Sequence, residues 1–478
     1  MKNTILFLLL ICTTFYSRAQ EKVLEYDPGI KNMVYGIATS YHAANSADSS
    51  VAFFILESNN VHGVFCDKQF NILAEMVFEQ KEKEYFAING HSIEGNTIHL
   101  FFSGKKANEL YAVSFDPVKK RTYGTWVPVV KDLNENDEVY VSAINHKNTL
   151  FQLYINKNTS ALRLYKVSSP SDVTSQTFGL SSDKIYEQFF KSDSPLSRLS
   201  IKNLGSKKVR TRATTINAEE FYTLEITSER NKIFSYQDHI IMTMDEDMLR
   251  TTLIDIDTDK NTAVVKNFNH LDGSLFNTWS PKTASFCYRN NLLQLRTNKN
   301  HLTLSVRNIE HDTLVALFEI LAKDPSMSII NSPVVETNNG FSKVKKFKPK
   351  TFLRKLDQLT PSVSAFRFGN NLEITLGGYL YSSGYSAPFI TSGMSVTGGI
   401  GGGIPVDKII SATGLFDLET FKHISGTVKP HFQIKASRPD PYMATSVSGE
   451  IKFSMGGYTF CGYYDTPKHK YFVYRYND

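Results

Sequence analysis

The chain has 478 residues, a formal net charge of +6 and 12% aromatic residues, among them 33 Phe and 24 Tyr. Charged residues make up 21% of the sequence. The combination of low hydrophobicity and high charge that characterises disordered chains is therefore absent, and we expect a folded protein. The length alone suggests about three domains, but all-β repeat folds exceed this prior as a single unit.

The N-terminus has the three parts of a secretory signal peptide. A short positive start over 1–3 precedes an apolar run over 4–16, and Ser17 and Ala19 occupy the −3 and −1 positions of a small-x-small cleavage site. The apolar run is shorter than the ~20 residues of a membrane-spanning helix, and no later run is long and apolar enough to span a membrane. We expect residues 1–19 to be removed and the mature chain to be exported to the periplasm, the cell surface or the extracellular space.

Removal of residues 1–19 leaves Cys66, Cys287 and Cys461. The odd number requires at least one free or intermolecular thiol, and it leaves room for one disulfide in an oxidising compartment without deciding which cysteines pair. The spacing matches no zinc site. We expect neither a metal nor a cofactor.

From residue 33 onward the sequence repeats a four-strand pattern, clearest over 33–78, 84–126, 139–178, 232–268 and 284–318. Within 84–126, the runs 96–104 and 109–116 predict a hairpin, which we interpret as the second and third strands of a unit flanked by strands over 84–88 and 121–126. The second strands of the five units begin at residues 50, 97, 149, 239 and 291. The intervals are 47, 52, 90 and 52 residues, and 90 is close to two units.

A period of this length with four strands in each unit is typical of a β-propeller. One four-stranded sheet cannot cover its own two faces, whereas radial stacking buries both faces and protects the sheet edges. We therefore predict an all-β fold: one β-propeller domain over 20–478, with about six or seven four-stranded blades and irregular insertions. The chain resembles the propeller architecture without the Trp-Asp, kelch or Asp-box marks of a named family. A pair of β-sandwiches, or another all-β array with coincidental spacing, is the alternative.

The repeat is broken over 179–220, which we interpret as an insertion projecting from the core, and it loosens after residue 321. We interpret 363–476 as one last blade that carries a long insertion. The strand Val23–Tyr26 belongs to no unit, so we expect it to pair with the last blade and close the ring.

The sharpest charge feature is a basic run of five lysines: Lys343, Lys345, Lys346, Lys348 and Lys350. Summed positive charge of this kind attracts anionic glycans or lipid head groups, although a solvated loop is the commoner outcome for a lysine-rich run. We expect the partner to be an envelope protein or an anionic glycan. Nucleic acid is not expected as the partner of an exported protein.

The Gly/Ser-rich segment 377–403 contains Tyr379, Tyr381 and Tyr385. One interpretation is a loop over a pocket mouth, where the tyrosines stack on sugar rings. The other is a glycine-containing hairpin packed on the fold.

Asp255, Asp257 and Asp259 alternate in a way that suits calcium, but the Gly and the closing Glu of an EF-hand loop are missing, and Asp-Lys-Asn is ordinary turn chemistry.

The sequence has no recognisable catalytic motif. We therefore expect a non-enzymatic binding or scaffold protein. The alternative is a polysaccharide-acting propeller hydrolase or lyase with carboxylates at the central axis. This alternative stays open because the separation of such carboxylates is spatial and cannot be recognised from sequence.

Overall fold

The computed structural model describes residues 20–30, 39–57, 60–79, 88–103, 109–128, 137–180, 185–187, 213–217, 220–245, 248–271, 281–338, 341–380, 389–391, 394–396, 408–428 and 447–476. The predicted signal peptide over 1–19 lies outside these ranges.

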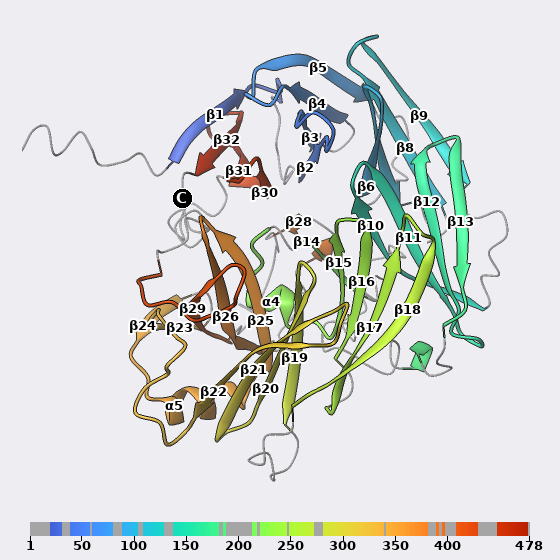
Figure 1. Ribbon diagram of the computed structural model, residues 1–478. Helices are drawn as coiled ribbons and strands as arrows, with labels where there is room; N and C mark the ends of the chain where they lie inside the picture. The colour runs from blue at the N-terminus through green and yellow to red at the C-terminus, as the bar shows by residue number, and fades with distance from the viewer. Residues whose placement is uncertain are drawn as a thin grey trace, which may run out of the picture.

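Within the described residues, seven sheets of four or five strands stand around a common centre, as a β-propeller requires (Figure 1). Blade 1 is built from β2 (Thr39–Ala44), β3 (Val51–Glu57), β4 (Asn60–Cys66) and β5 (Ile72–Glu79). Blade 2 is built from β6 (Ile88–Glu94), β7 (Thr97–Ser103), β8 (Glu109–Asp116) and β9 (Arg121–Pro128). Blade 3 is built from β10 (Glu138–His146), β11 (Thr149–Asn156), β12 (Leu162–Ser169) and β13 (Asp172–Phe178). The propeller prediction is confirmed.

Blades 4 and 5 continue the same order from the centre outward, antiparallel except for the innermost pair of blade 4, β14 and β15. They are built from β14 (Thr214–Asn217), β15 (Asn231–Tyr236), β16 (His239–Met244), β17 (Arg250–Asp257) and β18 (Thr262–Asn269); and β19 (Lys282–Tyr288), β20 (Asn291–Thr297), β21 (His301–Asn308) and β22 (Leu314–Leu321).

Blades 6 and 7 depart from simple sequence order. From the centre outward they contain β25 (Thr360–Phe368), β26 (Asn371–Leu380), β29 (Lys408–Asp417), β23 (Val334–Asn338) and β24 (Phe341–Lys345); and β30 (Val447–Met455), β31 (Tyr458–Asp465), β32 (Lys470–Tyr476) and β1 (Gln20–Tyr26). The segment 363–476, interpreted as one blade, is thus divided between two sheets. Its outer partner in blade 6, β23, comes from a region where no strand was assigned.

The ring closes as expected from the isolated N-terminal strand. β1 pairs antiparallel with β32, in a register that places Gln20 opposite Tyr476 and Tyr26 opposite Tyr471. Chain ends that are far apart in sequence therefore share one sheet, and blade 7 needs both of them to reach four strands.

The core lies between neighbouring blades, because adjacent residues of a strand point to opposite faces of its sheet. In β3, Phe53 faces blade 7, where its ring lies 5.7 Å from that of Phe453. Phe54 faces blade 2, where its ring lies 5.1 Å from that of Phe115. The continuous apolar run in β3 follows from this burial on both faces.

Of the predicted first strand of blade 2, 84–88, the structure describes Ile88 alone, and the first strand that it describes in this blade continues beyond the predicted end. The strand is β6, Ile88–Glu94, which begins with a bulge between Ile88 and Gly90. It was missed because the innermost strand carries polar residues such as His91 and Ser92 in place of an alternating apolar pattern.

Two segments that interrupt the repeat lie at the centre of the ring (Figure 1). β14 pairs in parallel with β15 on the inner edge of blade 4, and α4 (Leu224–Thr227) contacts β25 and β26 of blade 6. β28 (Met394–Val396), the partner of β27 (Phe389–Thr391), contacts β30 and β2. The expectation that 179–220 projects from the core is therefore wrong for its described end, which lies inside the ring.

Cys66, Cys287 and Cys461 are buried free thiols. Cys66 belongs to the core cluster between blades 7 and 1, and Cys461 lies in β31 of blade 7. Burial raises the pKa of each of these two thiols to about 12, which keeps them protonated and unreactive.

Candidate functional site

The five lysines of the basic run lie on the outer edge of blade 6. Lys343 and Lys345 belong to β24, and Lys350 lies in the first turn of α5 (Pro349–Leu356). The helix forms because Pro349, at the N1 position, fixes a helical φ, and because one face of the helix, with Phe352, Leu353 and Leu356, joins the core. The opposite face carries the cations outward.

One lysine of the run has a structural role. Lys345 Nζ lies 2.5 Å from Oε2 of the buried Glu336, and Lys355 Nζ lies 2.5 Å from Oε1 of the same carboxylate. The ring of Phe347 lies under both ammonium groups, at 5.7 Å and 5.0 Å. The hydrogen bonds from Lys345 and then Lys355 hold the pKa of Glu336 below its usual range.

The other cations of this region remain available to solvent. Lys343, Lys346, Lys348, Lys350 and Arg354 are exposed, and no carboxylate pairs with them within the part of the chain that the structure describes. We call these five residues the basic edge. α5 has no acidic residue in its first turn, and Lys348 at the N-cap makes no side-chain cap bond. Positive charge near a helix N-terminus is unfavourable. Lys348 and Lys350 both lie there, so they do not stabilise α5.

Tyr379, the one predicted tyrosine within the described residues, does not join the basic edge. Tyr379 is buried in β26, with its hydroxyl 3.5 Å from Oε1 of Glu225. Two strands, β29 and β23, separate β26 from β24. Tyr381 and Tyr385 lie outside the described residues.

A second group of side chains, not found from the sequence, lies on the innermost strands. Tyr41 of β2, His91 of β6 and Asn145 of β10 come from three successive blades. The hydroxyl of Tyr41 lies 2.7 Å from His91 Nδ1 and 3.3 Å from Asn145 Oδ1. With His42 and Glu220 we call this group the axial cluster.

The hydrogen bonds fix the orientation of Asn145 and the tautomer of His91. Asn145 Oδ1 accepts the backbone N–H of His91 at 3.2 Å, and Asn145 Nδ2 donates to the His91 carbonyl at 2.6 Å. The same amide nitrogen lies 3.0 Å from His91 Nδ1. Because the Asn145 Nδ2 donor faces Nδ1, we assign the acceptor to Nδ1 and the proton of the neutral ring to Nε2.

Burial determines the charge of the axial cluster. It lowers the pKa of His91 to about 3, helped by the neighbouring His42, and it lowers the pKa of His42 to about 4. Burial raises the pKa of Glu220 to about 7, although Asn217 and Tyr222 hydrogen-bond to its carboxylate. Opposite shifts of this kind are concentrated at functional sites.

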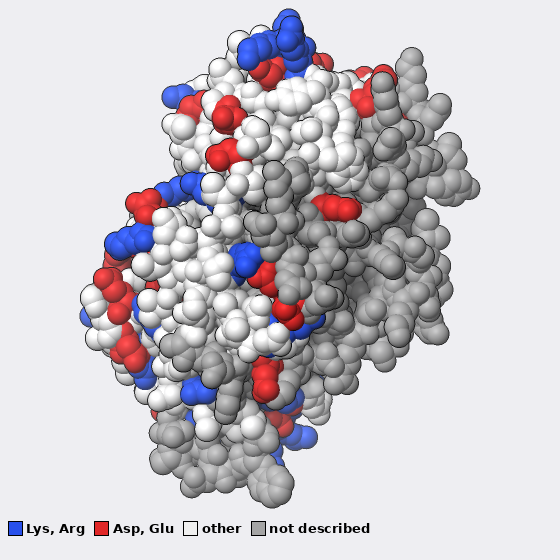
Figure 2. Space-filling model, turned by 90° about the vertical axis from the view of Figure 1, so that its right-hand side faces the viewer, with Lys and Arg blue, Asp and Glu red and all other residues white. Residues whose placement is uncertain are grey.

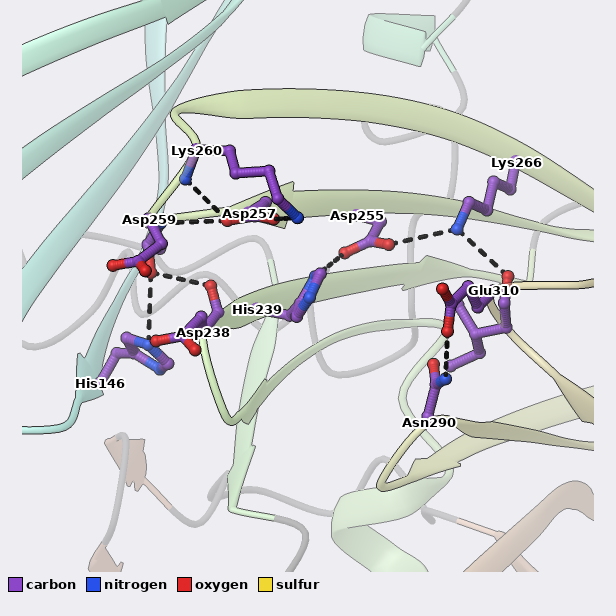
Figure 3. Close-up of polar contacts among 12 residues, drawn as sticks. His146, Asp238, His239, Asp255, Asp257, Asp259, Lys260, Lys266, Asn290 and Glu310 are labelled. Atoms are coloured by element: carbon purple, nitrogen blue, oxygen red, sulfur yellow. Dashed lines mark hydrogen bonds and ion pairs between the residues drawn. The ribbon is translucent and has the colours of Figure 1, made fainter.

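A third polar group lines the turns of blades 3 to 5 (Figure 3). His239 Nδ1 lies 2.7 Å from Asp255 Oδ1, and Lys266 Nζ lies 3.2 Å from the other oxygen of that carboxylate. Asp257 accepts backbone N–H groups of Asp259 and Lys260, and the Lys260 ammonium group holds its pKa at about 2. The turn interpretation of this acidic segment is confirmed.

Among the described residues, no three His, Cys, Asp or Glu side chains are grouped so as to hold a metal ion. Over the same residues, no helix has the length and apolar character of a membrane span.

No family model and no curated protein matches the sequence. Solved structures show similarity: the WD40 domain of SCAP from fission yeast has a TM-score of 0.37 at 8% identity, covering 97% of this chain and 99% of that one. The Dos1 propeller has a TM-score of 0.34 at 9% identity, covering 96% and 87%. A Synechocystis apocarotenoid oxygenase has a TM-score of 0.30 at 8% identity; the match covers 60% of this chain and 63% of that chain's length. The assignment of this chain as a β-propeller rests on its own sheet topology.

Proposed function

We propose that the protein is an exported binding or scaffold protein of the periplasm or cell surface, and that its basic edge docks an anionic glycan or an acidic envelope protein. The observation that carries this proposal is the set of five exposed cations on β24, α5 and the residues between them, supported by the buried face of α5.

The arrangement favours an anionic partner on electrostatic grounds. Like charges held on one rigid edge repel one another, and an anionic partner relieves this repulsion while their summed field increases its rate of association. On the side of the ring shown in Figure 2, by contrast, Lys and Arg are interspersed with Asp and Glu. The buried Glu336 keeps β24 and α5 in place through Lys345 and Lys355.

The enzyme alternative calls for a pair of carboxylates across the scissile bond. Glu220 is the carboxylate of the axial cluster, where its charge acts on the pKa of Tyr41. Among the described residues, the axial cluster holds one carboxylate beside neutral histidines, an arrangement that suits recognition of a ligand better than glycoside hydrolysis, so we propose binding.

The test compares two variants of the mature chain with equal net charge. One reverses Lys343, Lys346, Lys350 and Arg354 to Glu, and the control reverses four exposed lysines elsewhere, Lys68, Lys299, Lys323 and Lys422. Binding to immobilised heparin, a sulfated polysaccharide, is measured over a range of NaCl concentrations, with neutral dextran as the blank.

We expect the basic-edge variant to lose at least about tenfold in affinity, or about 1.4 kcal/mol, and to show a weaker dependence on salt than the control. Equal losses in both variants would show that net charge alone is responsible and would refute the proposal.

Export is tested separately: the chain recovered from the periplasmic or surface fraction should begin at Gln20, whereas recovery of full-length chain from the cytoplasm would contradict it.

A further inference from the structure

The axial cluster is a built site to which the innermost strands β2, β6 and β10 each contribute side chains. β6 brings His91 to the centre through the bulge at Gly90. A Cβ at that position would lie 2.2 Å from Asn145 Oδ1, so only glycine allows Asn145 to reach the His91 backbone. The sequence thus keeps a glycine at a φ of 154° where it is needed to hold the imidazole.

His91 presents a hydrogen-bond donor that the protein does not use. The residue is 7% exposed. Its Nδ1 lies 2.7 Å from the Tyr41 hydroxyl and 3.0 Å from Asn145 Nδ2, and its Nε2 has no partner among the described residues. A buried N–H without an acceptor costs about 1–3 kcal/mol, so an oxygen placed beside Nε2 would stabilise the folded protein.

The neighbouring groups define what such an oxygen belongs to. His42, Asn145 and Glu220 are partly exposed although they lie on the inner side of the ring, so a ligand at the centre can contact them. The ring of His42 is stacked on Phe453 at 4.5 Å. The histidines of the cluster are neutral near pH 7, and no Lys or Arg hydrogen-bonds to Tyr41, His91 or Asn145 in the contacts of the described chain. The cluster therefore offers donors and acceptors without positive charge, which disfavours an anion.

We propose that the axial cluster binds a small neutral polyhydroxyl ligand of the monosaccharide class. His91 Nε2–H donates to a ligand oxygen, and the carboxyl group of Glu220 exchanges hydrogen bonds with ligand hydroxyl groups. This site is separate from the basic edge. It extends the proposed binding function to a second ligand and does not depend on it.

The test uses His91→Asn in the full mature chain. The Asn side chain keeps an oxygen near the Nδ1 position to accept from Tyr41 and Asn145, and it lacks the Nε2–H donor. Binding of glucose, galactose and N-acetylglucosamine is measured by calorimetry, with glucuronate as the anionic probe. Imidazole ¹⁵N–¹H spectra, assigned by difference from His91→Asn, report whether the sugar shifts the Nε2–H signal. The charge-reversed basic-edge variant is the matched control.

We expect at least one neutral sugar to bind the wild-type chain, to shift the His91 signal, and to bind His91→Asn at least about tenfold more weakly. The basic-edge variant should keep full affinity for the sugar. The proposal is overturned if no neutral sugar binds, if His91→Asn binds equally well while its circular dichroism is native, or if glucuronate binds more tightly. A wild-type chain that binds a neutral sugar but not heparin would refute the proposed function alone. A wild-type chain that binds heparin but no neutral sugar would refute this inference alone.

Discussion

At the scale of single residues, one carboxylate joins two blades. Asp245 follows β16 in blade 4, and its Oδ2 accepts hydrogen bonds from Lys232 Nζ at 3.0 Å and from the backbone N and Oγ of Ser285 in blade 5, each at 2.8 Å. Its Oδ1 accepts from Thr251 at 3.0 Å. The side chains of Lys232 and Asp245 are 0% and 1% exposed.

Asp245→Ala would leave the Lys232 ammonium group buried without a counter-charge. We expect the free energy of unfolding to fall by about 3–5 kcal/mol, measured by urea denaturation followed by circular dichroism. Lys147→Ala, which breaks the exposed ion pair with Asp238, is the control and should change little. A change in Asp245→Ala no larger than in this control would show that Asp245 does not supply this stability.

Glu220 gives a pH signature of the ring centre. Its pKa rises from 4.5 to about 7 in the folded protein, so the folded chain keeps a proton that the unfolded chain releases. This stabilising contribution is complete below pH 4.5 and is lost as the pH rises through 7, a change of roughly 3 kcal/mol. In Glu220→Gln the contribution is absent. The stability of this variant relative to the wild type should therefore rise between pH 4.5 and 8 in urea titrations, and a constant difference would contradict the raised pKa of Glu220.

At the scale of elements, β1 tests how the ring is closed. Leu24 and Tyr26 are buried between blades 7 and 1, in one core cluster with Phe53 and Tyr471. We expect Leu24→Ala to lower the free energy of unfolding by about 2–5 kcal/mol, the range for removal of a buried leucine. Glu21→Ala, on the exposed side of the same strand, serves as the control. A small effect of Leu24→Ala in thermal and urea unfolding would mean that β1 is not needed for closure.

The hairpins could be predicted from sequence because their strands are apolar and their turns are local. A shared turn marks them: an Asp or Asn side chain accepts a backbone N–H three residues on, and the next residue has a positive φ. It occurs at Asp116–Lys120, Asn156–Ser160, Asp257–Asn261, Asn308–Asp312, Asp417–Phe421 and Asp465–His469. The Asp or Asn that begins each of these turns is visible in the sequence, and it would have located the strand ends more closely.

What the sequence could not predict depends on partners distant along the chain. The pairing of β23 with β29 joins residues at least seventy positions apart, and no local pattern encodes it. The lysine run was visible, but the role of Lys345 depends on Glu336, whose carboxylate gives no sign of burial in the sequence. The axial cluster combines single residues from three blades, so no spacing between Tyr41, His91 and Asn145 could reveal it.

At the scale of the whole molecule, the ring has no unique beginning. Gln20 lies opposite Tyr476 in the β1–β32 ladder, so a short Gly/Ser linker can join the two ends. Opening the chain between Asp312 and Thr313, in the turn between β21 and β22, would make β22 the first strand. It would then pair with the last strand, β21, as β1 pairs with β32 in the natural chain.

We expect this circular permutant to fold, because both new ends lie at an exposed turn and every pair of neighbouring strands is kept. Its circular dichroism and its cooperative thermal transition should match those of the wild type, with a modest loss of stability from the opened turn. The control opens the chain between Gln294 and Leu295, two buried residues inside β20, and should give no folded monomer. If both permutants fold equally well, or if neither folds, the blades are not interchangeable units of a closed ring, and the order in which the chain winds around the centre has its own role in folding.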